Sequence, residues 1–344
     1  MTGEDRRIAV VLFNLGGPKS LGDVRPFLKN LFSDPAIINL PAVARAPLAE
    51  LISRTRTRTA KANYAAMGGG SPLLEETQAQ ADALAAALAT RGHVAKVFIA
   101  MRYWAPATDA AARDVAAFQP TDVVLAPLYP QFSLTTTASS LAAWRAAYRG
   151  SGEVRIICCW PENEGLIDAH AKAIQETWEN AGRPAVRLLF SAHGIPVRTA
   201  ERGDPYAWQV ERTCQAIAAR LGSAWDWRLC YQSRVGPLEW LGPSTPEAIR
   251  EAAADGLGVL IDPVSFVSEH VETIIELDRD YAIIARDAGA SCYLRARTVG
   301  VRAPFIEGLA TAILDRLERV GTGPEGVACP AGFGGCVRDG RAAA

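Results

Sequence analysis

The chain has no excess of basic residues, because 36 lysines and arginines are balanced by 37 aspartates and glutamates. Nucleic-acid binding usually needs a basic surface, so the composition argues against nucleic-acid partners. Long apolar runs are also missing, and no stretch has the form of a signal peptide or a transmembrane helix. We therefore expect a cytoplasmic protein, with peripheral attachment at the inner membrane face left open. The seven cysteines should be mostly reduced thiols.

Several common catalytic signatures are missing as well. Gly16-Gly17-Pro18 follows the first predicted strand but lacks the G-x-G-x-x-G spacing of a dinucleotide-binding turn. The sequence contains neither a P-loop nor a G-x-S-x-G nucleophile elbow. The catalytic residues are therefore expected outside these three signatures.

Short apolar strand patterns alternate with helical patterns along most of the 344 residues. This alternation predicts an α/β fold, in which parallel sheets carry helices on both faces. Two apolar strands that end in Gly/Pro turns, at 13–18 and 190–196, suggest two Rossmann-like domains. We predict one domain at 1–150 and a second at 151–320, with a tail containing Gly and Cys at 321–344.

His193 stands out because of its place in the second half. Residues 186–190 read as a buried strand, and the pattern breaks at Gly194 and Pro196. His193 should therefore lie at the carboxyl end of a parallel strand, the edge where open α/β sheets bind their ligands. An imidazole at that edge could accept a proton or bind a metal ion. The alternative is a histidine that only caps a turn.

An acidic row follows in a helix predicted over 269–288. Glu269, Glu272, Glu276 and Asp280 share one face, and Arg279 is the only base nearby in the sequence. Such a row suits hydrated cations or proton transfer, although a solvated helix face is the alternative. His270 points away from this face, so we rank it below His193 as a catalytic candidate.

Aromatic residues cluster on loops that should border one cleft, and they point to a flat apolar ligand rather than to core filling alone. Arginine and serine side chains near these loops could meet carboxylates on that ligand. The aromatic residues are Tyr103, Trp104, Tyr129, Phe132 and Trp240, and the polar candidates are Arg56, Ser71 and Arg102.

Taken together, five motifs resemble the ferrochelatase family over roughly residues 8–318. They are Leu-Phe-Asn-Leu-Gly-Gly-Pro at 12–18, Gly-Gly-Gly-Ser-Pro at 68–72, Phe-Ser-Ala-His at 190–193 with Arg-Gly-Asp-Pro-Tyr at 202–206, the loop 231–243, and Ser-Glu-His-Val-Glu-Thr at 268–273. The resemblance implies two Rossmann-like domains with an active-site cleft between them. It also implies insertion of Fe²⁺ into protoporphyrin IX, which gives protohaem in the final step of haem synthesis.

The resemblance assigns roles to individual residues. His193 and Glu272 face each other across the macrocycle, and Glu276 lies further along the acidic helix. His193 would accept pyrrole protons, His193 and Glu272 could bind the metal, and Glu276, with Glu269, would relay protons or cations. Leu15, Phe132 and Trp240 would form the slot for the bent ring, with Gln232 as a further substrate contact in the same loop.

Some family members carry a [2Fe–2S] cluster on three tail cysteines and one earlier cysteine. Here the tail contains Cys329 and Cys336, Arg338 stands where a third thiolate is expected, and Cys158 is the candidate internal ligand. A cluster and a tail of unliganded thiols both remain open. So do a monomer or a homodimer, a chelatase for coproporphyrin or for cobalt or nickel, and a non-catalytic haem- or porphyrin-binding protein.

Overall fold

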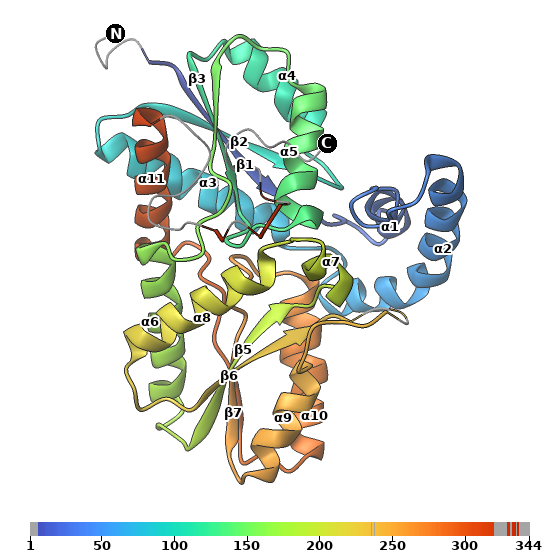
Figure 1. Cartoon of the computed structure of the whole chain (residues 1–344), viewed down its shortest axis with the longest axis vertical. Helices are drawn as coiled ribbons and strands as arrows, with labels where there is room; N and C mark the ends of the chain where they lie inside the picture. Colours follow the sequence, from blue (N-terminus) through green and yellow to red (C-terminus); the bar gives the residue numbers. More distant parts are fainter. Residues whose placement is uncertain are drawn as a thin grey trace. The chain divides into compact units, whose positions relative to one another are not determined.

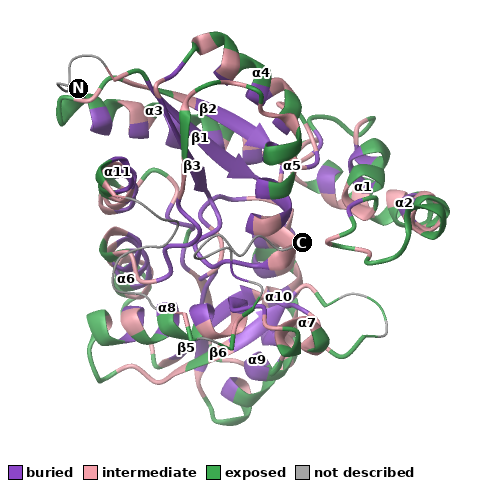
Figure 2. Ribbon diagram, turned by 45° about the horizontal axis from the view of Figure 1, so that its top comes forward, coloured by how far each residue is buried: buried purple, intermediate pink, exposed green. Residues whose placement is uncertain are grey.

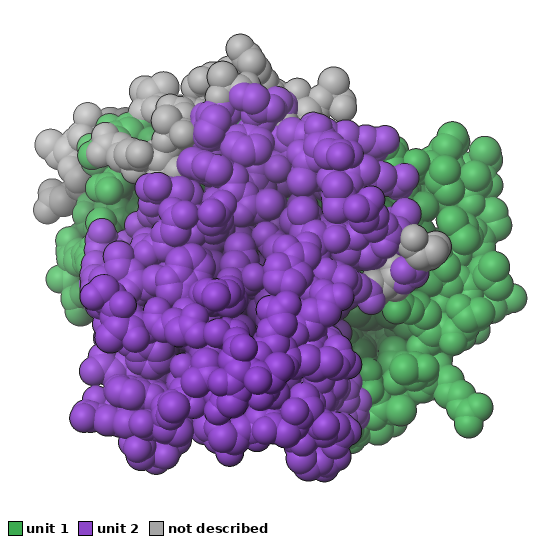
Figure 3. Space-filling view, turned by 60° about the horizontal axis from the view of Figure 1, so that its bottom comes forward, with its two compact units in different colours: residues 1–159, 310–324, 336–344 green, residues 160–309, 325–335 purple. Residues whose placement is uncertain are grey.

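The structure is a computed structural model that describes residues 6–234, 236, 238–319, 329–330, 332–334 and 336. It contains two compact units, shown in Figure 3. Unit 1 comprises the described residues within 1–159, 310–324 and 336–344, and unit 2 those within 160–309 and 325–335. Each unit contains a four-stranded parallel sheet flanked by helices, so the predicted fold class is confirmed. None of the helices within these ranges is long and apolar enough to cross a membrane.

The first sheet has the strand order β2-β1-β3-β4, and every pairing is parallel. Its central strand is buried along its whole length because helices cover both faces (Figure 2). The last strand was predicted at 154–158 as the start of the second half, but it pairs with β3 and completes the first sheet. The strands are β1 (Ile8–Asn14), β2 (Ala95–Met101), β3 (Asp122–Pro127) and β4 (Glu153–Ile156).

One face of this sheet packs against α4 and α5, where Phe13 meets Trp144 edge to face with ring centroids 6.0 Å apart. The sequence analysis did not predict α2, a long helix that packs on α1 (Figure 1). Its apolar residues follow no clear period, because much of its surface is exposed. The helices are α1 (Val24–Phe32), α2 (Ala42–Ala66), α3 (Leu73–Thr90), α4 (Thr108–Phe118), the π-helical turn η2 (Leu134–Ala138) and α5 (Ser139–Ala147).

The second sheet has the order β6-β5-β7-β8, again with parallel pairing throughout. Side chains alternate along β5. Leu188 and Phe190 pack with α6 (Glu164–Asn180) and α8 (Tyr206–Leu221), whereas Leu189 packs with α9 (Thr245–Ala254) and α10 (Tyr281–Asp287). The strands are β5 (Val186–His193), β6 (Trp227–Gln232), β7 (Gly258–Asp262) and β8 (Tyr293–Arg295), the last of which was not predicted.

The acidic helix differs from its prediction. Regular structure begins at Val271, and residues 272–280 form a π-helix before α10 continues the chain. The Tyr281 amide donates to the Glu276 carbonyl, five residues earlier, as π-helical bonding requires. The other helices are α6 (Glu164–Asn180), α7 (Val197–Glu201), α8 (Tyr206–Leu221), α9 (Thr245–Ala254), η3 (Glu272–Asp280), α10 (Tyr281–Asp287) and α11 (Ala303–Glu318).

Candidate active site

His193 is the last residue of β5, so the strand is three residues longer than predicted and ends at the imidazole. Its backbone amide donates to Ser265 Oγ at 3.0 Å, which ties the strand end to the loop after β7. His193 Nδ1 lies 2.6 Å from the Gly194 carbonyl oxygen. A carbonyl can only accept, so Nδ1 carries the hydrogen and neutral His193 presents Nε2 as its basic atom.

Glu272 lies between two histidines. Its Oε2 atom is 3.7 Å from His193 Nε2 and 3.5 Å from His270 Nε2. The Nδ1 atom of His270 faces the Ser268 carbonyl at 3.1 Å, so this imidazole also presents Nε2 to the carboxylate. Burial alone would raise the pKa of Glu272, but the charge of His193 and the contact with His270 lower it well below the ordinary value.

The structure thus brings His270 into the site, although the sequence analysis ranked it low. The ranking assumed an α-helix from residue 269, whereas regular structure begins only at Val271. Its side chain is 11% exposed, and Glu272 raises the pKa of His270 overall, against the effect of burial. The Ser-Glu-His-Val-Glu-Thr motif was the available signal, because it places a histidine two residues before the carboxylate.

Glu276 lies one turn along η3 from Glu272. Its Oε2 atom accepts hydrogen bonds from Ser233 Oγ at 2.7 Å and from Gln232 Nε2 at 3.2 Å. Burial raises the pKa of Glu276, and the negative charge of Glu272 raises it further. The surroundings therefore shift the pKa values of the two carboxyl groups in opposite directions, an arrangement often found in acid–base sites.

Gln232 has a fixed place in this network. Its side chain accepts a hydrogen bond from Ser191 Oγ at 2.9 Å and donates to Glu276, and the residue is only 1% exposed. Ser233, the next residue, has a φ of +62°, in the left-handed region that non-glycine residues rarely adopt. Strain of this kind often persists at functional sites because the surroundings hold it in place.

Glu269, by contrast, faces away from this network. Its Oε1 atom accepts from Arg295 Nη1 at 2.6 Å, and its Oε2 atom accepts from Thr273 Oγ1 at 2.7 Å. The acidic row therefore has a base that the local sequence did not reveal, because Arg295 lies on β8. At the other end of the row, Asp280 pairs with Arg279 at 2.7 Å.

Trp240 packs against Gly194, the residue that follows His193 at the end of β5. A Cβ atom added at Gly194 would lie 3.3 Å from Trp240 Cε3 and 2.9 Å from the Gln232 carbonyl oxygen, so the indole needs a glycine there. The Leu241 amide also donates to the Ile195 carbonyl at 3.1 Å. Within unit 2, the loop that carries Trp240 is therefore joined to the segment that follows His193.

In unit 1, the Leu15 turn and the Ser71 loop meet at the carboxyl edge of the first sheet. The Ser71 amide donates to the Pro18 carbonyl at 2.8 Å, and a Cβ atom at Gly17 would lie 2.5 Å from Ser71 Cβ. The Tyr103 amide donates to the Leu15 carbonyl at 2.9 Å. The two glycine-rich motifs of the first half thus form one loop cluster.

The other predicted substrate contacts of unit 1 have different surroundings. Arg102 Nη2 pairs with the buried Asp34 at 2.8 Å, and its Nε donates to Ser139 Oγ at 2.7 Å. Phe132 is fully buried in the core of unit 1. Arg56 is exposed on α2, with its guanidinium 5.9 Å from the centre of the Phe32 ring.

All seven cysteines lie among the described residues and are thiols. Cys158 and Cys336 are buried residues of unit 1, whereas Cys329 belongs to unit 2 and its sulfur accepts from Gln209 Nε2 at 3.3 Å. A [2Fe–2S] cluster usually needs four thiolates. Within the described part of the chain, no group of three or more His, Cys, Asp or Glu side chains is arranged to hold a metal ion. Arg338 lies outside the described residues, and the cluster stays a prediction.

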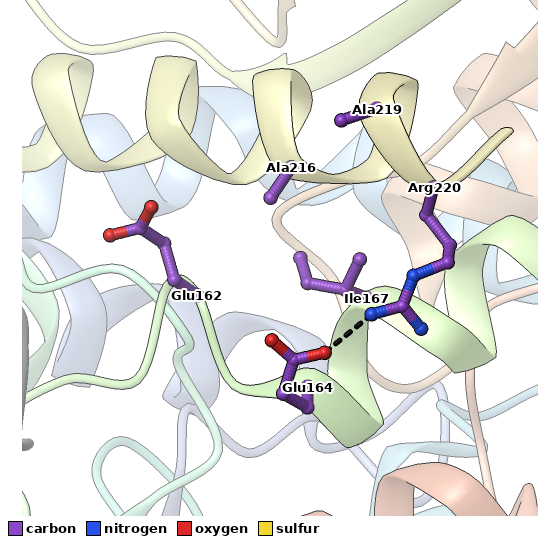
Figure 4. A pocket seen from close by; sticks show the side chains of 6 residues that line it. All are labelled: Glu162, Glu164, Ile167, Ala216, Ala219 and Arg220. Carbon is purple, nitrogen blue, oxygen red and sulfur yellow. Dashed lines mark hydrogen bonds and ion pairs between the residues drawn. The ribbon is translucent and has the colours of Figure 1, made fainter. Parts of the chain in front are cut away.

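A surface pocket of about 400 Å³ lies elsewhere in unit 2, between the start of α6 and the end of α8. Figure 4 shows Glu164 paired with Arg220 at one side and Glu162 at the other. None of its lining residues belongs to the histidine–carboxylate site. They are Glu162, Glu164, Ile167, Ala216, Ala219 and Arg220.

A strand-end histidine beside two carboxyl groups whose pKa values are shifted in opposite directions is typical of an α/β enzyme site. The ferrochelatase family model matches residues 7–317. The chain is 56% identical over 335 residues to a ferrochelatase of Phenylobacterium zucineum, covering 96% of this chain and 98% of that protein. It is 57% identical to a ferrochelatase of Caulobacter vibrioides (95% and 94% covered) and 41% identical to one of Pelagibacter ubique (95% and 97% covered).

Among solved structures, a multi-domain protein of Deinococcus radiodurans, described as structurally similar to chelatases, aligns with a TM-score of 0.53 at 15% identity. The alignment covers 90% of this chain but only 55% of that protein, and it supports the fold alone. The chain belongs to the ferrochelatase family, whose enzymes insert a metal ion into a porphyrin in haem synthesis. The family predicted from the motifs is therefore confirmed.

Proposed function

We propose that this enzyme inserts Fe²⁺ into protoporphyrin IX and forms protohaem. The observation that carries the proposal is the arrangement around Glu272, whose carboxylate faces the Nε2 atoms of both His193 and His270. This arrangement combines an imidazole that presents Nε2, a carboxyl group whose pKa is lowered and a second carboxyl group whose pKa is raised.

Metal insertion releases the two pyrrole N–H protons of the free-base ring, and each proton needs an acceptor. His193 Nε2 accepts the two protons in turn, because Nδ1 already donates to the Gly194 carbonyl, and it passes each proton through Glu272 to solvent before taking up the next. The resulting imidazolium would lie beside the negative charge of Glu272, which stabilises it. Glu276 stands behind Glu272 and exchanges protons with it, held by Ser233 and Gln232. General acid–base groups placed in this way typically contribute about 10²–10⁴-fold to a rate.

The same groups suit ferrous iron as the second substrate. Imidazole nitrogen and carboxylate oxygen both bind Fe²⁺, and neither is soft enough to select Cu(I). We propose that His193 and Glu272 contact the incoming ion as it exchanges its water ligands for pyrrole nitrogens. His270 contacts the Glu272 carboxylate and helps to keep it ionised.

For the porphyrin, we propose that Leu15 and Trp240 contact the ring, while Arg56 and Ser71 meet its carboxylates. Arg102 is less suited to this role because Asp34 already balances its charge. In this proposal the buried residues Phe132 and Gln232 do not touch the porphyrin: Phe132 packs in the core of unit 1, and Gln232 holds Glu276.

The cleft between the domains remains a prediction.

Anaerobic incubation with Fe²⁺ and protoporphyrin IX tests the proposal. Loss of porphyrin fluorescence with growth of the haem absorbance is expected for the parent chain, and neither for H193A. Parallel reactions with coproporphyrin, Co²⁺ and Ni²⁺ establish the preferred pair of substrates by kcat/KM. Tight binding of porphyrin or haem without turnover of any pair would identify a binding protein instead.

We also propose that the enzyme is cytoplasmic and attaches peripherally to the membrane through α2 and the residues before it. Val43 is 87% exposed and Leu51 58% exposed, and exposed arginines follow on the same helix at 54, 56 and 58. Apolar side chains beside basic ones suit an anionic lipid surface. The V43S/L51S variant should co-sediment with anionic vesicles less than the parent does. Val94, just before β2, is 85% exposed, and the control variant V94S should co-sediment as the parent does.

A further inference from the structure

The segment that carries Glu272 and Glu276 has an unusual backbone. Residues 272–280 form a π-helix, whereas π-helical bonding in proteins mostly appears as single-turn bulges, frequently at functional sites. An unfavourable backbone conformation persists only where the surrounding structure holds it. The contacts at both ends of η3 therefore matter for the placement of the two carboxyl groups.

Arg295 provides contacts at both ends. Its Nη1 donates to Glu269 Oε1, three residues before the π-helix, at 2.6 Å. Its Nε and Nη2 donate to the two oxygens of Asp278, near the end of the π-helix, each at 2.6 Å. Glu272 and Glu276 lie between the two residues that this one guanidinium holds.

The arrangement around Arg295 is buried and specific. The Arg295 and Glu269 side chains are 6% and 9% exposed, and Glu269 also accepts from the Thr298 amide at 3.1 Å. Burial works against the positive charge of Arg295, but the two carboxylates raise its pKa overall. A planar guanidinium can bond Asp278 through two parallel bonds and still reach Glu269, whereas a lysine ammonium cannot reproduce that fork.

We propose that Arg295 is a positioning residue for metal insertion, which holds the π-helical segment so that Glu272 stays opposite His193 and Glu276 stays beside Ser233. The inference rests on the proposed function. Arg295 does not touch the reacting atoms in this proposal. It acts through the register of η3, and small displacements of positioned groups can cost about 10²-fold in rate.

Two substitutions test the proposal. R295K keeps the charge but loses the fork, and D278N weakens only the more exposed end, where Asp278 is 41% exposed. R286K is the matched control, because Arg286 is 72% exposed and pairs only with its neighbour Asp287 among the contacts described. We expect R295K to lower kcat about 10- to 100-fold, with the porphyrin KM little changed. D278N should act in the same direction but more weakly, and R286K should match the parent.

Two further measurements separate positioning from simple stabilisation. The pH profile of kcat should shift in R295K and D278N, because the spacing of Glu272 and Glu276 sets their protonation. Amide hydrogen exchange over 270–281 should quicken, while exchange in α3 of unit 1 stays at the parental rate. Exchange needs no turnover, so it tests Arg295 even if the parent inserts no iron.

Two outcomes would overturn the proposal. If R295K has the kcat, the pH profile and the amide exchange of the parent, the guanidinium of Arg295 does not hold the π-helical segment in place. Faster exchange with parental kcat and pH profile would reduce Arg295 to a structural role. If R295K does not fold, D278N decides the matter by the same criteria.

Discussion

Replacing Glu272 with glutamine is the most direct test of the site, since it keeps the side-chain shape and removes the charge. When His193 takes up a pyrrole proton, the imidazolium forms 3.7 Å from the Glu272 carboxylate. Two unit charges at about 4 Å attract by about 4 kcal/mol near a protein surface and by about 1 kcal/mol in bulk water. The side chains are 39% and 28% exposed, so an intermediate value of about 2 kcal/mol is appropriate.

A loss of about 2 kcal/mol of transition-state stabilisation lowers kcat about 30-fold. Glu272 also exchanges protons in the proposed mechanism, so the full loss should approach about 10³-fold. The assay is single-turnover metal insertion under anaerobic conditions, with porphyrin affinity measured separately by fluorescence. A kcat within a fewfold of the parent, at equal porphyrin affinity, would refute the assignment of Glu272.

Stability gives a second readout of the same substitution. The folded chain holds the pKa of Glu272 below its ordinary value of 4.5, so the ionised group stabilises the fold above that pH. This contribution is lost as the pH falls through the lowered pKa. The unfolding free energy of E272Q should therefore depend less steeply on pH between about 5 and 2, with little loss at neutral pH. An acid dependence identical to that of the parent would contradict the ionised state assigned here.

Three other predictions follow from the same geometry. H193A should abolish insertion but leave porphyrin binding largely intact, and turnover within a fewfold of the parent would rule out His193 as the base. E276Q should lower kcat less than E272Q does, and it should mainly raise the metal concentration that the enzyme requires. Because the folded chain raises the pKa of Glu276, ionising this residue lowers the unfolding free energy as the pH rises. E276Q should therefore lose less stability than the parent as the pH rises. If Cys158, Cys329 and Cys336 hold a [2Fe–2S] cluster with a fourth ligand, protein purified without oxygen from iron-replete cells should be red-brown with about two sulfides per chain, and C336S should lose the colour. A colourless protein without bound sulfide would rule the cluster out.

Much of the fold was predictable because its signals are local. Apolar runs such as 8–13 and 95–101 carry enough β-branched and aromatic side chains to identify buried parallel strands. The alternation of strands and helices then fixes the fold class without knowledge of any contact. The short strand β8 was missed because its three residues are too few to form a pattern, and α2 because its exposed surface shows no apolar period.

The site was predictable only in part, for a related reason. The position of His193 follows from the strand and the glycine beside it, both of which lie within a few residues of it. The identity of the proton-accepting nitrogen does not, because it depends on the direction of the Gly194 carbonyl. Likewise, the buried state of Phe132 depends on how the core of unit 1 closes around it.

The acidic row shows where local reasoning fails. An α-helical register from residue 269 placed Glu269, Glu272 and Glu276 on one face and His270 off it. The structure instead starts the helix later and widens its turn, which brings His270 to Glu272. The residue that separates Glu269 from the others is Arg295, which lies on a strand that the sequence pattern did not reveal. Acidic residues that are regularly spaced in a sequence can therefore have different surroundings in the fold. Here Glu269 bonds Arg295, whereas Glu272 faces His193 and Glu276 accepts from Ser233, and all three partners are distant in the sequence.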